Sequence, residues 1–377
     1  MILLVAGFCT ASGQQAKPQF VIESKRTFPP GTTFPGAEWE KVTSPEAAGY
    51  SSEKLEVLRA WLKTQNTTGM LVAVGGRVLL EYGDAKQVSK IASVRKSILG
   101  MLYGNYVVTG KIDLHKTVKE LGLDDVGKLL PFEERATLQD LLTARSGIYL
   151  DTDREAPRRG SQVPGVNFYY QNWDFNAAGA AFEKLTGKNI YDALETDLAR
   201  PIGMQDFDRA KQKKEPGERG GQISEHPEYA MYLSTRDMAR IGMLMLRAGQ
   251  WKDQQVLPKN WTDYLTTLVT PVKQMPPDTR LWPSSGPCRW GYGAMWWVWD
   301  ASDAPLLFSS ATWSYFNGSF TAQGTDGQYI TVLPMFDMVV AHKNARIDQN
   351  PDVNVPLFEY QTMLQMLMAA RCEGACK

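Results

Sequence analysis

A serine and a lysine stand three residues apart at the start of an apolar segment that covers residues 91–108. On a helix, residues with this spacing share a face, so the amine of Lys96 can reach the hydroxyl of Ser93. An amine that burial keeps neutral can take the proton of a serine hydroxyl, which is otherwise a poor nucleophile. The first N–H groups of a helix lack intrahelical partners, so the N–H of Ser93 could stabilise an oxyanion. The spacing therefore indicates a serine nucleophile for acyl transfer.

The same pattern occurs a second time in the chain, where a simpler interpretation applies. Ser51, Ser52 and Lys54 open an amphipathic segment that runs to Thr64. Serine is a favoured N-cap residue, so these serines are predicted to cap a solvated helix. Ser93 could also be only a cap, and the pattern alone does not decide between the two roles.

The composition describes an ordinary globular protein. The chain has 377 residues, 43% of them hydrophobic, and 41 basic residues balance 41 acidic ones. This balance gives no indication of nucleic acid or an anionic membrane surface as a partner, and no apolar run approaches the roughly 20 residues of a membrane span. No Cys/His pairing has metal-ligand spacing, so we expect neither a metal nor another cofactor. A small molecule is the expected partner, and the oligomeric state stays open.

The two ends of the chain carry signals about cellular location. Residues 1–15 are apolar and then small, which resembles the end of a secretory signal, although a first strand is an alternative. We expect export to the periplasm or the outside of the cell, with the cytoplasm as the alternative. Cys372 and Cys376 lie close together and could form a disulfide in an exported protein.

The order of predicted elements divides the chain into a sheet part and a helical part. Two strands joined by Gly75-Gly76 precede the Ser93 helix, and two more strands and a closing helix end the chain. Helical patterns dominate the middle of the chain and predict helices over 138–144, 176–185, 191–198 and 235–247. We predict an extended lead-in over 16–46, a discontinuous sheet domain over 47–117 and 271–377, and a mainly helical domain over 118–270.

Further motifs resemble those of the serine beta-lactamase and penicillin-recognising superfamily, and most of all its class C beta-lactamase-like branch. That branch includes related esterases and amidases of the 6-aminohexanoate-dimer-hydrolase type. A Tyr-x-Asn motif at Tyr170-Gln171-Asn172 follows Ser93 and Lys96 in the order typical of the family. Other stretches resemble the family's framework: 141–148, 201–204, 233–240 and 290–293.

The resemblance implies an α+β fold of the beta-lactamase/transpeptidase type, with an antiparallel sheet flanked by helices and an inserted, mainly helical domain. It implies that Ser93, Lys96 and Tyr170 are catalytic and that Asn172 orients the lysine or a substrate amide. The Tyr-x-Asn matches at Tyr103 and Tyr315 are interpreted as structural, because their position and surroundings do not fit the motif.

The third motif of the family is altered in this chain. The family's Lys-Thr-Gly corresponds to Thr325-Asp326-Gly327, so the lysine is absent. Without that cation a carboxylate-bearing substrate loses a favourable partner, and an inward-facing Asp326 would repel it. Thr325 and Gly327 are expected to border the substrate, and the N–H of Gln328 is the expected second oxyanion donor. A plain hairpin turn is the alternative interpretation of Thr325 and Asp326.

These features together predict a serine hydrolase that cleaves a small ester or amide through a Ser93 acyl-enzyme, with Lys96 and Tyr170 sharing the roles of general base and acid. A class C-like beta-lactamase or a D-amino-acid peptidase is the alternative within the enzymes. A non-catalytic ligand-recognition module on the same fold is the alternative from another class. A Ser-His-Asp hydrolase is disfavoured, because none of the three histidines has a recognisable catalytic setting.

Overall fold

The computed structural model describes residues 33–150, 156–219, 222–276, 290–300, 315–348 and 353–376. The segment 1–15, for which a secretory signal is predicted, lies outside the described residues. None of the described helices is both long and apolar enough to cross a membrane.

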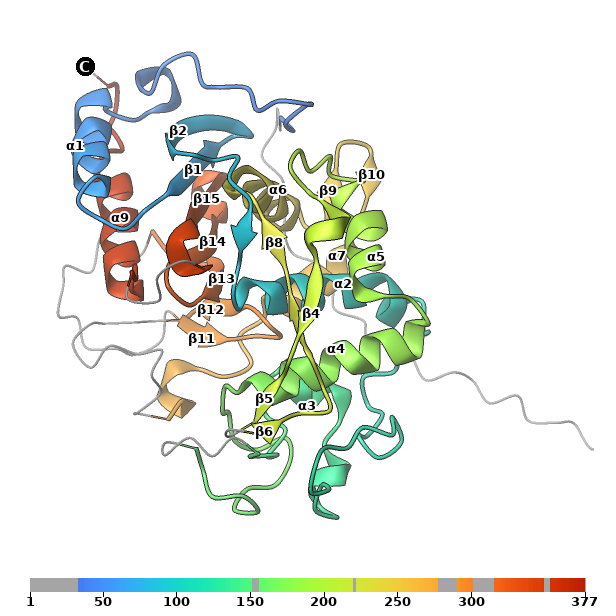
Figure 1. Ribbon diagram of the computed structural model, residues 1–377. Helices are drawn as coiled ribbons and strands as arrows, with labels where there is room; N and C mark the ends of the chain where they lie inside the picture. The colour runs from blue at the N-terminus through green and yellow to red at the C-terminus, as the bar shows by residue number, and fades with distance from the viewer. Residues whose placement is uncertain are drawn as a thin grey trace, which may run out of the picture.

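A seven-stranded antiparallel sheet is formed from both ends of the described chain (Figure 1). The strand order is β11-β12-β13-β14-β15-β1-β2, and β1 pairs with β15 so that Leu71 lies opposite Ala341. The prediction that the first and last segments share one sheet agrees with this pairing. The strands are β1 (Gly69–Val74), β2 (Arg77–Gly83), β11 (Trp290–Tyr292), β12 (Trp297–Trp299), β13 (Phe320–Gly324), β14 (Gln328–Leu333) and β15 (Met338–Lys343).

Helices cover both faces of the sheet, which explains why every residue of β14 and β15 is buried. Helices α1 (Ser52–Leu62) and α9 (Leu357–Ala369) pack against each other on one side. Helices α2 (Val94–Val108) and α6 (Thr235–Leu246) lie on the other side, where α2 contacts β13 and α6 contacts β14, β15 and β1. Figure 1 shows these two layers with the sheet between them. The predicted α+β fold is therefore correct.

The middle of the chain forms the helical part, with α3 (Leu138–Leu142), α4 (Asn172–Thr186), α5 (Ile190–Ala193) and a π-helix at Leu194–Ala199. Helices α4 and α6 differ from the sequence-based expectation. Helix α4 begins at Asn172, before the expected Asn176, because extended Gln171 directly precedes it. Helix α6 packs on the sheet although the sequence placed it within the helical range 118–270, because its small residue Gly242 allows close contact with Val339.

Short strands in the described parts of the chain form four further sheets of two strands each. Strand β4 (Lys213–Glu215) pairs with β7 (Glu228–Ala230), and β3 (Ser89–Lys90) pairs with β8 (Tyr232–Leu233). The remaining short strands are β5 (Glu218–Arg219), β6 (Gln222–Ile223), β9 (Gln250–Trp251) and β10 (Gln254–Gln255), and helix α7 covers Lys259–Leu265. Strand β3 leads directly into the start of α2, so the pairing of β3 with β8 helps to fix where α2 begins.

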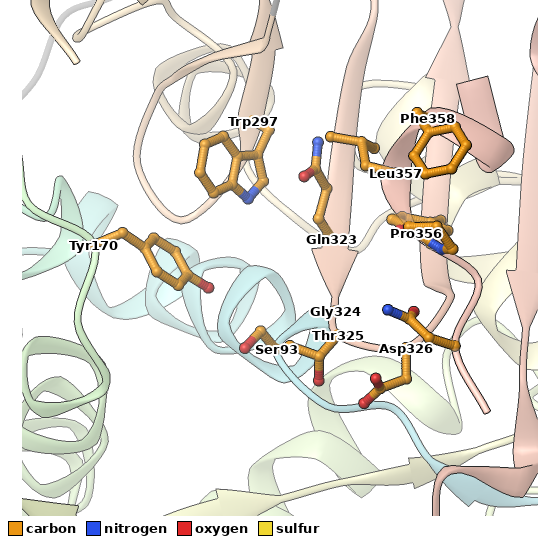
Figure 2. Close-up of a pocket in the computed structure, with 12 residues that line it drawn as sticks. Ser93, Tyr170, Trp297, Gln323, Gly324, Thr325, Asp326, Pro356, Leu357 and Phe358 are labelled. Atoms are coloured by element: carbon orange, nitrogen blue, oxygen red, sulfur yellow. The ribbon is translucent and has the colours of Figure 1, made fainter. Parts of the chain in front are cut away.

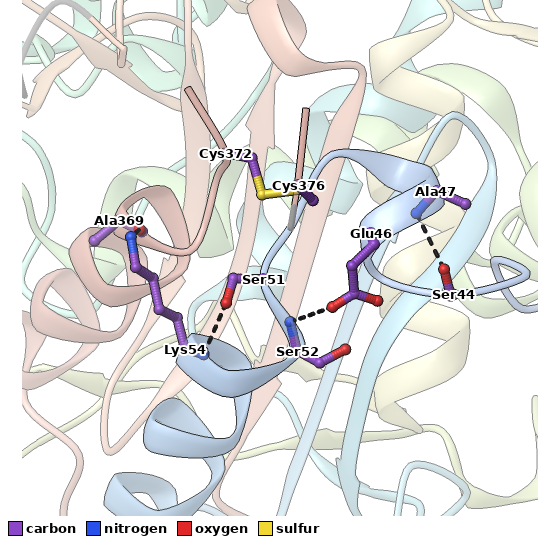
Figure 3. The surroundings of a disulfide bond; sticks show 9 residues. All are labelled: Ser44, Glu46, Ala47, Ser51, Ser52, Lys54, Ala369, Cys372 and Cys376. Carbon is purple, nitrogen blue, oxygen red and sulfur yellow. Dashed lines mark hydrogen bonds between the residues drawn. A yellow bond between two sulfur atoms is a disulfide. The ribbon is translucent and has the colours of Figure 1, made fainter. Parts of the chain in front are cut away.

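The C-terminal segment is attached to α1 (Figure 3). Cys372 and Cys376 form a disulfide, and the Lys54 amine donates a hydrogen bond to the carbonyl of Ala369 at 2.9 Å. Ser51 accepts a hydrogen bond from the N–H of Lys54, as expected of an N-cap. The first Ser-x-x-Lys match is therefore a helix cap.

Candidate active site

Ser93 lies at the start of α2 and does not cap the helix. Its backbone is already helical, with φ −71° and ψ −6°, and its side chain makes no capping hydrogen bond. Ala92 before it has φ +45°, a left-handed conformation that is unfavourable for alanine. Such backbone strain is concentrated at functional sites in proteins. The geometry therefore favours the nucleophile interpretation of Ser93 over the capping interpretation.

Lys96 is buried one turn into α2, with 1% of its surface exposed. Its amine donates hydrogen bonds to the Tyr170 hydroxyl at 2.9 Å and to the Asn172 amide oxygen at 2.7 Å. The amine also lies 4.2 Å from the centre of the Tyr170 ring and 4.6 Å from that of Phe175. The side chains of Ser93, Lys96, Tyr170 and Asn172 are thus brought together from two separate segments of the chain.

Tyr170 lies just before α4, and Figure 2 shows its hydroxyl directed toward Ser93. The ring packs against Phe175 and Trp297, with centroids 5.0 and 5.4 Å away. Burial raises the pKa of Tyr170 to about 12, although a hydrogen bond with Ser93 and the charge of Arg95 oppose this change. The phenol is consequently neutral near pH 7 and has a proton to give.

The end of strand β13 approaches the backbone at Ser93 closely. A Cβ on Gly324 would lie 2.7 Å from the carbonyl of Ile91 and 3.1 Å from the N–H nitrogen of Ser93. Only glycine allows the strand to come this near the turn that carries Ser93. Gly324 was missed from the sequence, although an isolated glycine at the end of a strand is a known sign of close backbone approach.

The residues of the predicted third motif divide into two groups. Thr325 and Asp326 line the pocket beside Ser93 (Figure 2). Gly327 and Gln328 do not line it: the carbonyl of Gly327 is hydrogen-bonded to His342, and the buried side chain of Gln328 donates to the carbonyl of Asn344. Gln328 pairs with Gly324 across the two strands, and its Cβ lies 3.0 Å from the position that a Cβ on Gly324 would take. The expectation that the backbone N–H of Gln328 supplies an oxyanion donor stays a prediction.

The pocket next to Ser93 has a volume of about 320 Å³, which is within the range of small-molecule sites. One wall is apolar and is formed by Trp297, Pro356, Leu357 and Phe358 (Figure 2). Asp326 is the single charged side chain among the described residues that line the pocket. The remaining lining residues are Ser93, Tyr170, Gln323, Gly324, Thr325, Tyr329 and Asn354.

A buried polar network fixes α2 relative to the helical part. Arg95, which is 3% exposed, donates a hydrogen bond to the Asn176 amide oxygen at 2.9 Å and lies 3.6 Å from the carboxylate of Glu228. Lys90 bridges the carboxylates of Glu215 and Glu228 at 2.6 and 3.2 Å. Since Asn176 belongs to α4, Arg95 holds together the two segments that supply Lys96 and Tyr170.

The other candidate motifs have structural roles. The hydroxyl of Tyr103 donates a hydrogen bond to the carbonyl of Ala178, and Tyr315 packs against Phe336. None of the three histidines lines the pocket at Ser93. His115 is exposed, His226 packs against Trp173, and His342 is buried between Thr67 and Gly327.

The fold and the site together define an α+β serine hydrolase architecture, in which the candidate nucleophile starts a helix that packs on an antiparallel sheet. The Beta-lactamase family model matches residues 56–342, and the chain therefore belongs to the beta-lactamase family. No curated protein matches the chain.

Solved structures share this fold at low sequence identity. A protein from Bacillus anthracis assigned as a 6-aminohexanoate-dimer hydrolase has 18% identity and a TM-score of 0.58, covering 93% of this chain and 90% of its own. A penicillin-binding protein from Bacillus halodurans has 15% identity and a TM-score of 0.56, covering 82% and 99%. A beta-lactamase from Mycobacterium bovis has 18% identity and a TM-score of 0.54, covering 83% and 99%.

Proposed function

We propose that the protein is a serine hydrolase that cleaves a small ester or amide through an acyl-enzyme on Ser93. The observation that carries this proposal is the convergence of three groups: the buried amine of Lys96 is hydrogen-bonded to Tyr170, and the Tyr170 hydroxyl is directed toward Ser93 (Figure 2). A hydroxyl, a phenol and an amine that converge in this way form a path along which the serine proton can leave.

The reaction has two halves. The Ser93 oxygen attacks the substrate carbonyl while its proton passes to the Tyr170–Lys96 pair, and the same pair then protonates the departing alcohol or amine. Water next attacks the acyl-enzyme, gives up a proton to the pair and releases the acid, which restores the Ser93 hydroxyl. Because the titrations of Lys96 and Tyr170 are coupled, the first proton acceptor is assigned to the pair and not to either residue.

The N–H of Ser93 supports the charged intermediate. It lies at the N-terminal end of α2, where the helix dipole favours negative charge, and next to Gly324, which brings the backbone of β13 close to the same point. Asn172 accepts a hydrogen bond from Lys96 and so keeps the amine directed toward Tyr170.

A labelling experiment tests the nucleophile. A fluorophosphonate should add its mass to the peptide that contains Ser93, and Ser93→Ala should abolish both labelling and p-nitrophenyl ester hydrolysis. Ser51→Ala is the matched control, because Ser51 and Lys54 have the same spacing but Ser51 only caps α1. Label on another residue, or ester hydrolysis that persists in Ser93→Ala, would show that the assignment is wrong.

Export is a separate proposal and is supported by the disulfide between Cys372 and Cys376. Disulfides persist mainly outside the reducing cytoplasm. Fractionation of the native host followed by immunodetection of the protein tests this location.

A further inference from the structure

The pocket beside Ser93 has one strongly polar end. Asp326 lies in the turn between β13 and β14, and Figure 2 shows it on the opposite side of Ser93 from Tyr170. Its left-handed conformation, with φ +62°, is one that aspartate tolerates better than most residues. The neighbouring carbonyl of Gly327 is held by buried His342 at 2.7 Å. The position of the carboxylate is therefore set by the hairpin and by a buried hydrogen bond.

The charge of Asp326 is not neutralised by the residues around it. The side chain is partly buried, and it forms no ion pair with any residue in the described parts of the chain. Thr325 provides a hydrogen bond, but burial is the stronger influence and raises the pKa of Asp326 above its usual range. A partly desolvated carboxylate without a cation is unfavourable, and a bound cation would relieve this cost.

We propose that Asp326 selects substrates that carry a positively charged nitrogen near the ester or amide, with an apolar chain against Trp297 and Leu357. The inference rests on the proposed hydrolase activity and names its substrate class. The apolar wall and the carboxylate lie at different sides of one pocket, so they can bind the two parts of such a molecule at once.

The same geometry disfavours substrates with a carboxylate near the reacting carbonyl. A negative group placed beside Asp326 would face a like charge at the polar end of a pocket whose other described lining residues are uncharged. Penicillins and cephalosporins carry such a carboxylate, so slow hydrolysis of nitrocefin is expected.

The test uses the full-length protein and pairs of esters of equal shape. One pair consists of p-nitrophenyl esters of an ω-trimethylammonio fatty acid and of its neutral tert-butyl analogue. The second pair places the same two groups on the alcohol side, as in acetylthiocholine and its neutral carbon analogue. A trimethylammonium group keeps its charge at every pH, so each pair isolates the contribution of the charge.

The measured quantity is the ratio of kcat/KM for the cationic ester to that for its neutral partner. We expect a ratio of about ten in at least one pair, as for a single partly screened charge pair. Asp326→Asn should bring this ratio to about one, since asparagine keeps the turn conformation and removes the charge. Asp253→Asn, in the exposed turn between β9 and β10, should keep the wild-type ratio.

The possible outcomes separate the two proposals. Ser93-dependent hydrolysis of the neutral esters without a cation preference in either pair overturns the role of Asp326 and leaves the hydrolase intact. A cation preference that persists in Asp326→Asn also overturns the role of Asp326 and leaves the hydrolase intact. Absence of any Ser93-dependent hydrolysis overturns the hydrolase, and with it the substrate class. Fluorophosphonate labelling of Asp326→Asn at Ser93 verifies that this variant is folded.

Discussion

The amine of Lys96 donates a hydrogen bond to the hydroxyl of Tyr170 at 2.9 Å, although 74 positions separate them in the chain. Lys96 comes from the helix that packs on the sheet, and Tyr170 precedes the first helical residue of α4. The contact therefore spans the boundary between the sheet part and the helical part. A movement of either part would separate the two groups, so the packing between α2 and α4 is essential for the proposed chemistry.

Tyr170→Phe should lower kcat about 10²- to 10⁴-fold, which is the usual contribution of a general acid or base. The phenylalanine ring keeps the contacts with Phe175 and Trp297, so the variant should remain folded. Tyr103→Phe is the matched control, because it removes a buried hydroxyl from the other Tyr-x-Asn motif on α2. Steady-state ester kinetics should show normal kcat in the control, and an equal loss in both variants would contradict the assignment.

Gly324→Ala should lower kcat about 10²-fold, because the added Cβ would meet the backbone of Ile91 and Ser93 and displace the nucleophile. Gly36→Ala offers a control, since nothing but a carbonyl oxygen at 3.9 Å lies near its added Cβ. The measurement is ester turnover together with the rate of fluorophosphonate labelling. Unchanged labelling in Gly324→Ala would show that β13 does not restrict the position of Ser93.

Arg95→Met should lower the free energy of unfolding by about 3 kcal/mol. The reason is that removal of the cation from a buried ion pair leaves the charge of the remaining carboxylate with less compensation. Asn176 would lose its donor and Glu228 one of its two cations. Arg200→Met removes a cation whose side chain is 68% exposed and should change stability by less than about 1 kcal/mol. Denaturant unfolding measures both values, and similar effects of the two substitutions would argue against the network.

His342 should make the protein less stable in mild acid. Burial lowers the pKa of His342 from 6.5 to about 4, so between these values the unfolded chain binds a proton that the folded chain does not. The free energy of unfolding therefore falls as the pH drops from about 6.5 to 4, by up to about 3 kcal/mol for this group. At pH values above 6.5 His342 is neutral in both the folded and the unfolded chain, so its contribution to the free energy of unfolding is constant.

His342→Gln provides the comparison for this prediction. The variant lacks the titrating ring, so its stability should depend less on pH between 4 and 6.5 than that of the wild type. The difference between the two proteins cancels contributions from other titrating groups that both contain, such as His226 and Asp237. Parallel stability curves over this pH range would show that His342 is protonated in the folded protein.

Local patterns in the sequence predicted many of the secondary elements. The hairpin of β1 and β2, the helix that follows Ser93, and the last two strands depend on apolar periodicity and turn residues, which act between near neighbours. The cap at Ser51 could be anticipated for the same reason. The boundaries were less accurate: the expected helix at Tyr191–Leu198 is a short α-helix followed by a π-helix, a distinction that periodicity does not make.

The sequence by itself determined which residues could form an acylation site and the order in which they occur. Only the tertiary structure decided which of these candidates meet. It joined Lys96 to Tyr170 and left Tyr103 in the core, it brought Gly324 next to Ser93, and it placed α6 on the sheet. The physical reason is that such contacts depend on how distant segments pack, and the distance between two side chains in the fold is not encoded in their spacing along the chain.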